Sequence, residues 1–396
     1  MSQGLRSHFE SISDLRRYYE VLRKQGDIYP INAMSFVVTD YQFIRSILRQ
    51  SDDFRTFDFS ERIKQLLLID PVKYDFNDIR KSMSDWLLFM DGNDHLIWKK
   101  RLMQRMYRLD LLGIIESEWE HVAATLDHRH EFDLMNDLCE PLISRIMCSI
   151  LGIDPNHFSL IRTFEKHFMK AIVPMMTLES LNDIKGAHSA FREMQIAGWE
   201  DGTLKQARLL DDLLNNVEEN ERANVMSQME FMLAAGIETS IMLLTESIFR
   251  LLTDLKKEAQ MLKNKEERSF LIEELIRMSS PISVLTRKAV KDMEIGGHQI
   301  KEGNILLLFL ACVNRDPRYF PYPDQVNSEN LSNPHLAFGL GRHHCIGSEL
   351  AKMEMNVVLP AFFSRFGDRA RIDTEHREVI KHSFYTPSIE SLHIKC

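Results

Sequence analysis

Apolar positions recur at helical spacing along most of the chain. Between Asp91 and Asp316 they return every three or four residues, the interval that places them on one face of an α-helix. Ser13 and Gly26 bracket an earlier segment of this kind, as a capping residue and a terminating glycine do. The pattern predicts helices over residues 14–24, 41–49, 93–108, 111–126, 133–151, 155–172, 178–200, 204–217, 224–252, 263–278 and 348–366.

Short β-rich segments interrupt the helical pattern. Residues 28–30 and 35–39 flank a turn and predict a hairpin, and residues 284–290 and 294–300 predict strands around the Gly296-Gly297 turn. Residues 54–90 have no clear period, so we expect a long functional connection there, a candidate lid. These elements predict a mainly α fold with small β-sheets (α+β), in a single domain over residues 1–396.

Composition and charge exclude several classes of protein. With 49 Lys plus Arg against 58 Asp plus Glu, the net charge is -9, which disfavours nucleic-acid binding. The longest near-continuous apolar run, residues 305–313, is much shorter than the roughly 20 residues of a membrane-spanning helix, and the N-terminus lacks an apolar signal core. We therefore expect a cytoplasmic protein without a membrane span. Five cysteines without a C-x-x-C pair favour reduced thiols.

The segment from Phe338 to Gly347 concentrates the candidate chemistry. It places Cys345 after two glycines, Gly339 and Gly341, and directly before a predicted helix. The glycines permit backbone conformations that other residues avoid, and a helix N-terminus favours a thiolate. A phosphate loop fits poorly because a third glycine is missing, and zinc fits poorly because no partner cluster is present. The residues alone favour a metal-binding thiolate, and a buried structural cysteine stays open.

This segment resembles the haem-binding signature of the cytochrome P450 family, Phe-Gly-x-Gly-x-His-x-Cys-x-Gly. Every fixed position is filled, by Phe338, Gly339, Gly341, His343, Cys345 and Gly347. Residues 314–317 and 348–354 also resemble family segments, with Lys352 where Arg is frequent. The resemblance covers nearly the whole chain in the soluble bacterial form of the family. It implies a cytochrome P450 fold with haem b between a long distal helix and the helix after the cysteine loop, and Cys345 as the iron ligand.

An acid and an alcohol lie in the middle of the predicted helix over residues 224–252. Glu238 could face solvent and Thr239 could bond back to its own helix, so the pair alone indicates little. The segment resembles the oxygen-binding helix of the family. The resemblance implies that Ala235 and Gly236 give room for dioxygen, that Thr239 steadies it and that Glu238 assists proton delivery. The retained pair favours dioxygen over peroxide as co-substrate.

Haem propionates need cations or other hydrogen-bond donors, because unpaired carboxylates beside an apolar pocket are costly. The resemblance implies four donors, which are His95, Lys99, Arg287 and His343. Lys99 stands where the family usually has Arg, so a point charge replaces a bidentate group.

Glu274 and Arg277 match the family's Glu-x-x-Arg motif. Three residues apart on a helix, they could form a surface ion pair worth under about 1 kcal/mol. The resemblance implies instead a buried structural pair that supports the haem-thiolate core. Gln325 and Val326 stand where the family often has Arg and Phe, so a third member of this network is in doubt.

Four cations on the predicted helix that contains His95 can be interpreted in two ways. The four are Lys100, Arg101, Arg105 and Arg108. In the first interpretation they simply form a solvated helix face, which would show the same charges. The resemblance implies a docking surface for an acidic ferredoxin or flavodoxin, which with its reductase delivers electrons from NAD(P)H.

The candidate substrate residues are apolar and lie where the family varies. They are Met169, Ile172, Val173, Met232, Ile282, Val284, Leu285 and Phe384. Such residues suit an apolar small molecule, although a Met-rich stripe is also common in protein cores. Basic residues within the segment 54–90 could hold a carboxylate or the phosphopantetheine arm of a carrier protein, or could be solvated. They are Arg62, Lys64, Lys73, Arg80 and Lys81.

The resemblance implies a haem-thiolate monooxygenase that hydroxylates an apolar small molecule such as a secondary metabolite, lipid or terpenoid. Epoxidation, oxidative coupling and oxidation of a carrier-protein-bound intermediate are alternatives within the family. A haem-binding sensor without turnover is an alternative from another class.

Overall fold

The computed structural model describes residues 12–50, 52–56, 63, 76–171, 178–203, 209, 218–367, 369–373, 379–381 and 388–396. They form two compact units. The first unit comprises Met1–Arg55, Trp119–Glu140 and Thr239–Cys396, and the second comprises Thr56–Glu118 and Pro141–Glu238. The predicted extent of one domain over residues 1–396 stays a prediction.

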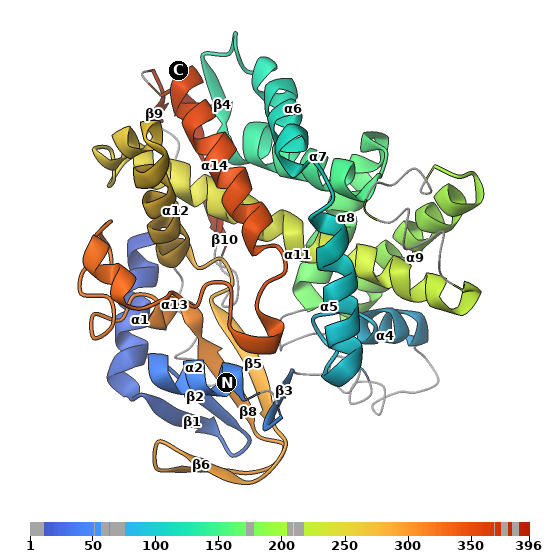
Figure 1. Cartoon of the computed structure of the whole chain (residues 1–396), viewed down its shortest axis with the longest axis vertical. Helices are drawn as coiled ribbons and strands as arrows, with labels where there is room; N and C mark the ends of the chain where they lie inside the picture. The colour runs from blue at the N-terminus through green and yellow to red at the C-terminus, as the bar shows by residue number, and fades with distance from the viewer. Residues whose placement is uncertain are drawn as a thin grey trace. The chain divides into compact units, whose positions relative to one another are not determined.

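The first unit contains a five-stranded sheet with the strand order β1-β2-β8-β5-β3. Strands β1 and β2 form the predicted hairpin, in which Tyr29 pairs with Val37. Strand β2 runs parallel to β8, and β5 runs antiparallel to β8, so segments far apart in sequence share one sheet (Figure 1). The strands are β1 Ile28–Asn32, β2 Ser35–Val38, β3 Phe54–Thr56, β5 Val284–Ala289 and β8 Ile305–Phe309.

Smaller sheets complete the β content. Strand β6 (Met293–Ile295) pairs with β7 (His298–Ile300) around the Gly296-Gly297 turn. One strand over residues 294–300 was therefore a wrong prediction, because both glycines adopt positive φ, +56° and +80°, and reverse the chain. The remaining strands are β4 Glu131–Asp133, β9 Arg371–Ile372, β10 Val379–Lys381, β11 Ser388–Ser391 and β12 His393–Lys395.

Helices complete the first unit. Helix α2 (Tyr41–Arg49) begins at Asp40, whose carboxylate accepts the backbone N–H groups of Gln42 and Phe43 at 2.9 Å. Its buried face contributes Ile44 and Leu48 to the core beneath the sheet. The other helices are α1 Ile12–Gln25, α12 Lys265–Ser279, α13 Leu310–Val313 and α14 Ser348–Arg365, with 3₁₀ turns η5 Glu258–Lys263, η6 Ser328–Ser332 and η7 Gly341–His343.

The second unit is helical. Its helices α8 and α9 pack through aromatic rings, with the ring centroids of Phe164 and Phe191 4.4 Å apart. Helices α6 and α11 each contribute residues to both units. The bounds are α4 Asn77–Ser84, α5 Gly92–Met106, α6 Leu111–Ala124, α7 Glu140–Leu151, η3 Pro155–His157, α8 Phe158–Ala171, α9 Leu178–Glu200 and α11 Glu219–Leu252.

The mainly α fold with small sheets is confirmed. Two further local predictions were wrong. Residues 133–151 are not one helix, because Asp133 ends β4 and caps a π-helical turn, η2 (Leu134–Cys139), before α7. Residues 54–90 include helix α4, whose eight residues are too few to show a clear period. Residues 57–62 and 64–75 of the candidate lid, and the predicted helix over residues 204–217 apart from residue 209, lie outside the described residues.

Helix α11 is apolar and long enough to meet a membrane-span criterion over Glu221–Leu252. However, 72% of its most apolar window is buried inside the protein. The core helix of a soluble protein has the same properties, so this feature is weak support for a membrane span.

Candidate functional site

The cysteine loop, residues 335–347, ends at the N-terminus of α14. The backbone N–H of Cys345 donates to the carbonyl oxygen of Phe338 at 2.9 Å, and the N–H of Gly339 donates to Leu336 at 2.9 Å. Gly339 and Gly341 have φ angles of +66° and +74°, the left-handed region that favours glycine. These contacts close the loop and bring the thiol to the start of the helix.

Gly341 also permits a close approach between the cysteine loop and α2. A Cβ at this position would lie 2.5 Å from the carbonyl oxygen of Leu48, which is far inside contact distance. Arg342, the next residue, pairs with Asp52 at 3.4 Å. The second glycine of the motif is therefore required by both the backbone angle and the packing.

The exposure of Cys345 distinguishes it from the other cysteines. Its side chain is exposed, whereas Cys139, Cys148 and Cys312 are buried. Burial raises the pKa of each of these three thiols to about 12, which keeps them protonated. An accessible sulfur at a helix N-terminus, in a loop with a fixed backbone, fits a thiolate ligand for haem iron.

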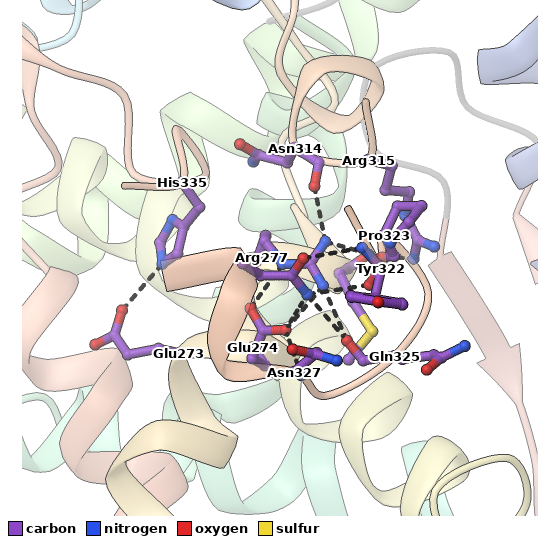
Figure 2. A network of polar contacts seen from close by, with 12 residues as sticks. Glu273, Glu274, Arg277, Asn314, Arg315, Tyr322, Pro323, Gln325, Asn327 and His335 are labelled. Carbon is purple, nitrogen blue, oxygen red and sulfur yellow. Dashed lines mark hydrogen bonds and ion pairs between the residues drawn. The ribbon is translucent and has the colours of Figure 1, made fainter. Parts of the chain in front are cut away.

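Glu274 and Arg277 form a bidentate ion pair on α12 (Figure 2). The Arg277 Nε and Nη2 atoms donate to the two carboxylate oxygens at 2.7 and 3.0 Å, and both side chains are at most 2% exposed. The pair is thus buried rather than on the surface.

Backbone groups and Asn330 extend this network. Arg277 donates to the carbonyl oxygens of Asn314 and Pro323 at 2.8 Å and of Gln325 at 3.3 Å (Figure 2). Asn330 donates to Glu274 at 2.7 Å. The backbone N–H of Asn327 also donates to Glu274, at 3.2 Å, so Asn330 and this N–H supply donors to the carboxylate where the family often has Arg. The sequence analysis did not identify either residue.

The acid and alcohol motif lies on an accessible stripe of α11. Ala235, Gly236 and Thr239 are half-buried, whereas the neighbours Ala234 and Ile237 are buried. Residues 235 and 239 are one turn apart and share a helix face. Glu238 is 8% exposed, so the reading in which it faces solvent is wrong.

Gly236 packs against α7 within the second unit. A Cβ on Gly236 would lie 3.0 Å from the Cε and 3.2 Å from the Sδ of Met147. A side chain at this position would therefore meet the thioether of Met147. The expectation that Gly236 gives room for dioxygen stays a prediction.

Ser240, the residue after the alcohol, meets a buried acid from α14. Glu354 is 1% exposed, and burial raises the pKa of its carboxyl to about 7, although the nearby Ser240 hydroxyl opposes the rise. A carboxyl that titrates near neutral pH therefore lies beside the motif. Periodicity predicted a helix through Glu354 but gave no sign of this environment.

The four predicted propionate donors are divided between the units. Arg287, on β5, is 6% exposed, and His343 lies in η7 of the cysteine loop. Strand β5 approaches this loop, because a Cβ on Gly339 would lie 3.8 Å from the Cδ1 of Leu285. His95 and Lys99 are on α5 of the second unit, where His95 is buried and Lys99 is half-buried.

The substrate candidates have different environments. Ile282, two residues before β5, and Leu285, on β5, are half-buried, whereas Val284 and Met232 are buried. Ile172, Val173 and Phe384 lie outside the described residues, as does the side chain of Met169.

Comparisons with known proteins agree with this geometry. The family model described as Cytochrome P450 matches residues 269–388, which contain both the buried ion pair and Cys345. The chain is 26% identical over 388 residues to the polyketide biosynthesis cytochrome P450 PksS of Bacillus subtilis, with 92% of this chain and 90% of that protein covered. It is 24% identical over 377 residues to the biotin biosynthesis cytochrome P450 of the same organism, with 91% of each covered.

A solved structure shows the same fold. The chain superimposes with a TM-score of 0.84 on P450BioI in complex with an acyl carrier protein ligated to hexadec-9Z-enoic acid, at 21% identity and with 97% of this chain and 98% of that chain covered. Family model, relatives and fold agree: the chain belongs to the cytochrome P450 family, and it is a monooxygenase of the oxidoreductase class, whose members use haem b, dioxygen and electrons from a redox partner.

Proposed function

We propose that this enzyme hydroxylates an apolar small molecule, with Cys345 as the ligand of haem iron. The observation that carries the proposal is the exposed Cys345 side chain, in a loop closed onto the carbonyl oxygen of Phe338. When bound, haem supplies the chemistry that activates dioxygen. Arg287 and His343, both in the first unit, are donors that would hold its propionates. His95 and Lys99 are further candidates by the family resemblance alone.

Glu238 and Thr239 would control protons on α11. Cleavage of the O–O bond consumes protons, yet free access of water would release hydrogen peroxide without oxidising the substrate. A nearly buried acid beside a half-buried alcohol can pass one proton at a time. The Thr239→Ala variant should keep its haem spectrum but divert electrons from product to peroxide. Fully coupled turnover in this variant would remove Thr239 from the proton path.

The reaction is tested by reconstitution. Purified enzyme is combined with a ferredoxin, its reductase and NAD(P)H, and a panel of lipids, terpenoids and polyketides is first screened for a spin-state shift in the haem spectrum. For a compound that shifts the spectrum, we expect a product heavier by one oxygen atom. NAD(P)H oxidation that no compound stimulates would favour the sensor over the monooxygenase. A product with a new ring bond or an epoxide would identify the alternative chemistry.

Helix α5 provides the proposed docking surface for the redox partner. Lys100 on α5 and Arg108, two residues after its end, are exposed, whereas Arg101 stacks over the Trp98 ring at 5.2 Å and lies 3.8 Å from Glu221. Lys100 and Arg108 are therefore better positions than Arg101 for substitutions that test docking, because the Arg101 side chain already contacts Trp98 and Glu221. Replacing both with Gln should slow reduction by an acidic ferredoxin at low salt and not at high salt. Lys256→Gln, at an exposed site of the first unit, is the matched control. Equal rates at low salt would contradict this surface.

A carrier-bound substrate is the second candidate. P450BioI was solved with an acyl carrier protein, and the name of PksS places that relative in polyketide biosynthesis. In the described part of the chain, Lys81 is exposed on α4 and Arg80 is half-buried, while Arg62, Lys64 and Lys73 lie outside it. Tighter binding of an acyl carrier protein than of the free fatty acid would favour this candidate.

We also propose that the enzyme is cytoplasmic, which cell fractionation tests.

A further inference from the structure

Glu273 makes a second ionic contact beside the Glu274–Arg277 pair. Its Oε2 atom lies 3.1 Å from the Nε2 of His335, and its Oε1 atom lies 2.6 Å from the Nζ of Lys352. Figure 2 shows Glu273 and His335 turned away from the Arg277 cluster. We call Glu273, His335 and Lys352 the clamp. It joins α12, the cysteine loop and α14, all within the first unit.

The protonation of the clamp follows from its contacts. The Nδ1 atom of His335 accepts the backbone N–H of Ala337 at 3.3 Å, so Nε2 carries the ring proton and donates to Glu273. Burial alone would raise the pKa of Glu273, but the hydrogen bonds from His335 and Lys352 lower it to about 2. Glu273 is therefore a carboxylate at working pH, and it can hold both partners.

Both partners of Glu273 contact the ring of Phe338. The His335 ring centroid is 5.9 Å from that of Phe338, and the Lys352 Nζ lies over the Phe338 ring at 5.8 Å from its centroid. The carbonyl oxygen of Phe338 is the acceptor for the Cys345 N–H. A continuous set of contacts therefore leads from Glu273 to the backbone of the proposed iron ligand.

We propose that Glu273 is a positioning residue for the iron ligand: by holding His335 and Lys352 against Phe338, it fixes the backbone to which Cys345 is bonded. The proposal rests on the proposed function, because it requires Cys345 to ligate haem iron. The clamp also gives a reason for the cation at position 352. Lysine satisfies one carboxylate oxygen and places its charge over an aromatic ring, so loss of the charge should loosen the loop.

Replacement of Lys352 separates positioning from simple electrostatics. Loss of a positive charge near the haem would by itself lower the iron reduction potential, since a cation favours the added electron. A loosened loop acts in the opposite direction, because water that reaches the sulfur weakens electron donation by the thiolate and raises the potential. The sign of the shift in Lys352→Met therefore distinguishes the two effects.

The experiment compares Lys352→Met, Lys352→Arg and Glu273→Gln with the wild-type holoenzyme. Glu267→Gln, at an exposed site of the same helix, is the matched control. Spectroelectrochemistry gives the potential, and amide hydrogen exchange reports the order of residues 335–347. We expect upward shifts and about tenfold faster exchange in this segment for Lys352→Met and Glu273→Gln. Lys352→Arg and the control should resemble the wild type.

Two results would overturn the inference. One is a downward or absent shift in Lys352→Met, and the other is unchanged exchange of residues 335–347 in Glu273→Gln. Failure of the proposed function would look different, since the wild type itself would then lack the thiolate band in its ferrous carbon monoxide spectrum. Exchange in residues 335–347 is measurable in either case, so the two failures are distinguishable.

Discussion

Glu354 should make the stability of the holoenzyme fall as the pH rises. Its carboxyl is 1% exposed, and burial raises its pKa from 4.5 to about 7. The folded state therefore binds more protons than the unfolded state between these pH values, so the free energy of unfolding decreases with pH across this window. Each pKa unit corresponds to about 1.4 kcal/mol, which gives a loss of about 2–3 kcal/mol between about pH 5 and pH 8.

The Glu354→Gln variant should lack this loss, because an amide does not ionise. Urea unfolding of both proteins from pH 5 to pH 8 gives the difference in unfolding free energy, in which the titrations common to both cancel. We expect the variant to gain about 2–3 kcal/mol relative to the wild type across this range. Glu349→Gln, at an exposed site in the first turn of α14, should show no such change. A pH-independent difference for Glu354→Gln would refute the reasoning.

Two further substitutions test the buried ion pair and the packing of the cysteine loop. Glu274→Gln leaves Arg277 buried without its charged partner, so it should cost about 3–5 kcal/mol in urea unfolding and lower the haem content of purified protein; a cost under about 1 kcal/mol would indicate a solvated pair. Gly341→Ala adds both a positive-φ penalty and a clash with Leu48, whereas Gly297→Ala, at a φ of +80° with nothing within 4 Å, adds only the penalty. We therefore expect a larger fall in Tm for Gly341→Ala, and equal falls would contradict the packing argument.

The helices with strong local signals were predictable from the sequence. Helix α2 has Asp40 as its cap and a regular apolar face, and its observed bounds equal the predicted ones. The turn at Gly296-Gly297 was also identified, but its effect on the flanking strands was not, because positive φ at both glycines is a property of the folded chain. Helix α4 was missed because eight residues span barely two turns.

The parts of the site that follow from residue spacing within a short motif were predictable from the sequence. The spacing around Cys345 identified the loop, and the spacing of Glu274 and Arg277 identified the ion pair. The sequence could not show that Asn330 and the backbone N–H of Asn327 would donate to Glu274 where the family often has Arg. It also gave no sign of the environment of Glu354, because burial and its neighbour Ser240 arise only from the packing of α14 against α11.

The central claim is that Cys345 is the thiolate ligand of haem iron. The most direct measurement is the difference spectrum of the purified protein, reduced with dithionite, before and after addition of carbon monoxide. The account predicts a strongly red-shifted Soret band of the thiolate type in the wild type and its loss in Cys345→Ala. A histidine-type band in correctly folded wild-type protein, or a thiolate band that survives in Cys345→Ala, would contradict it.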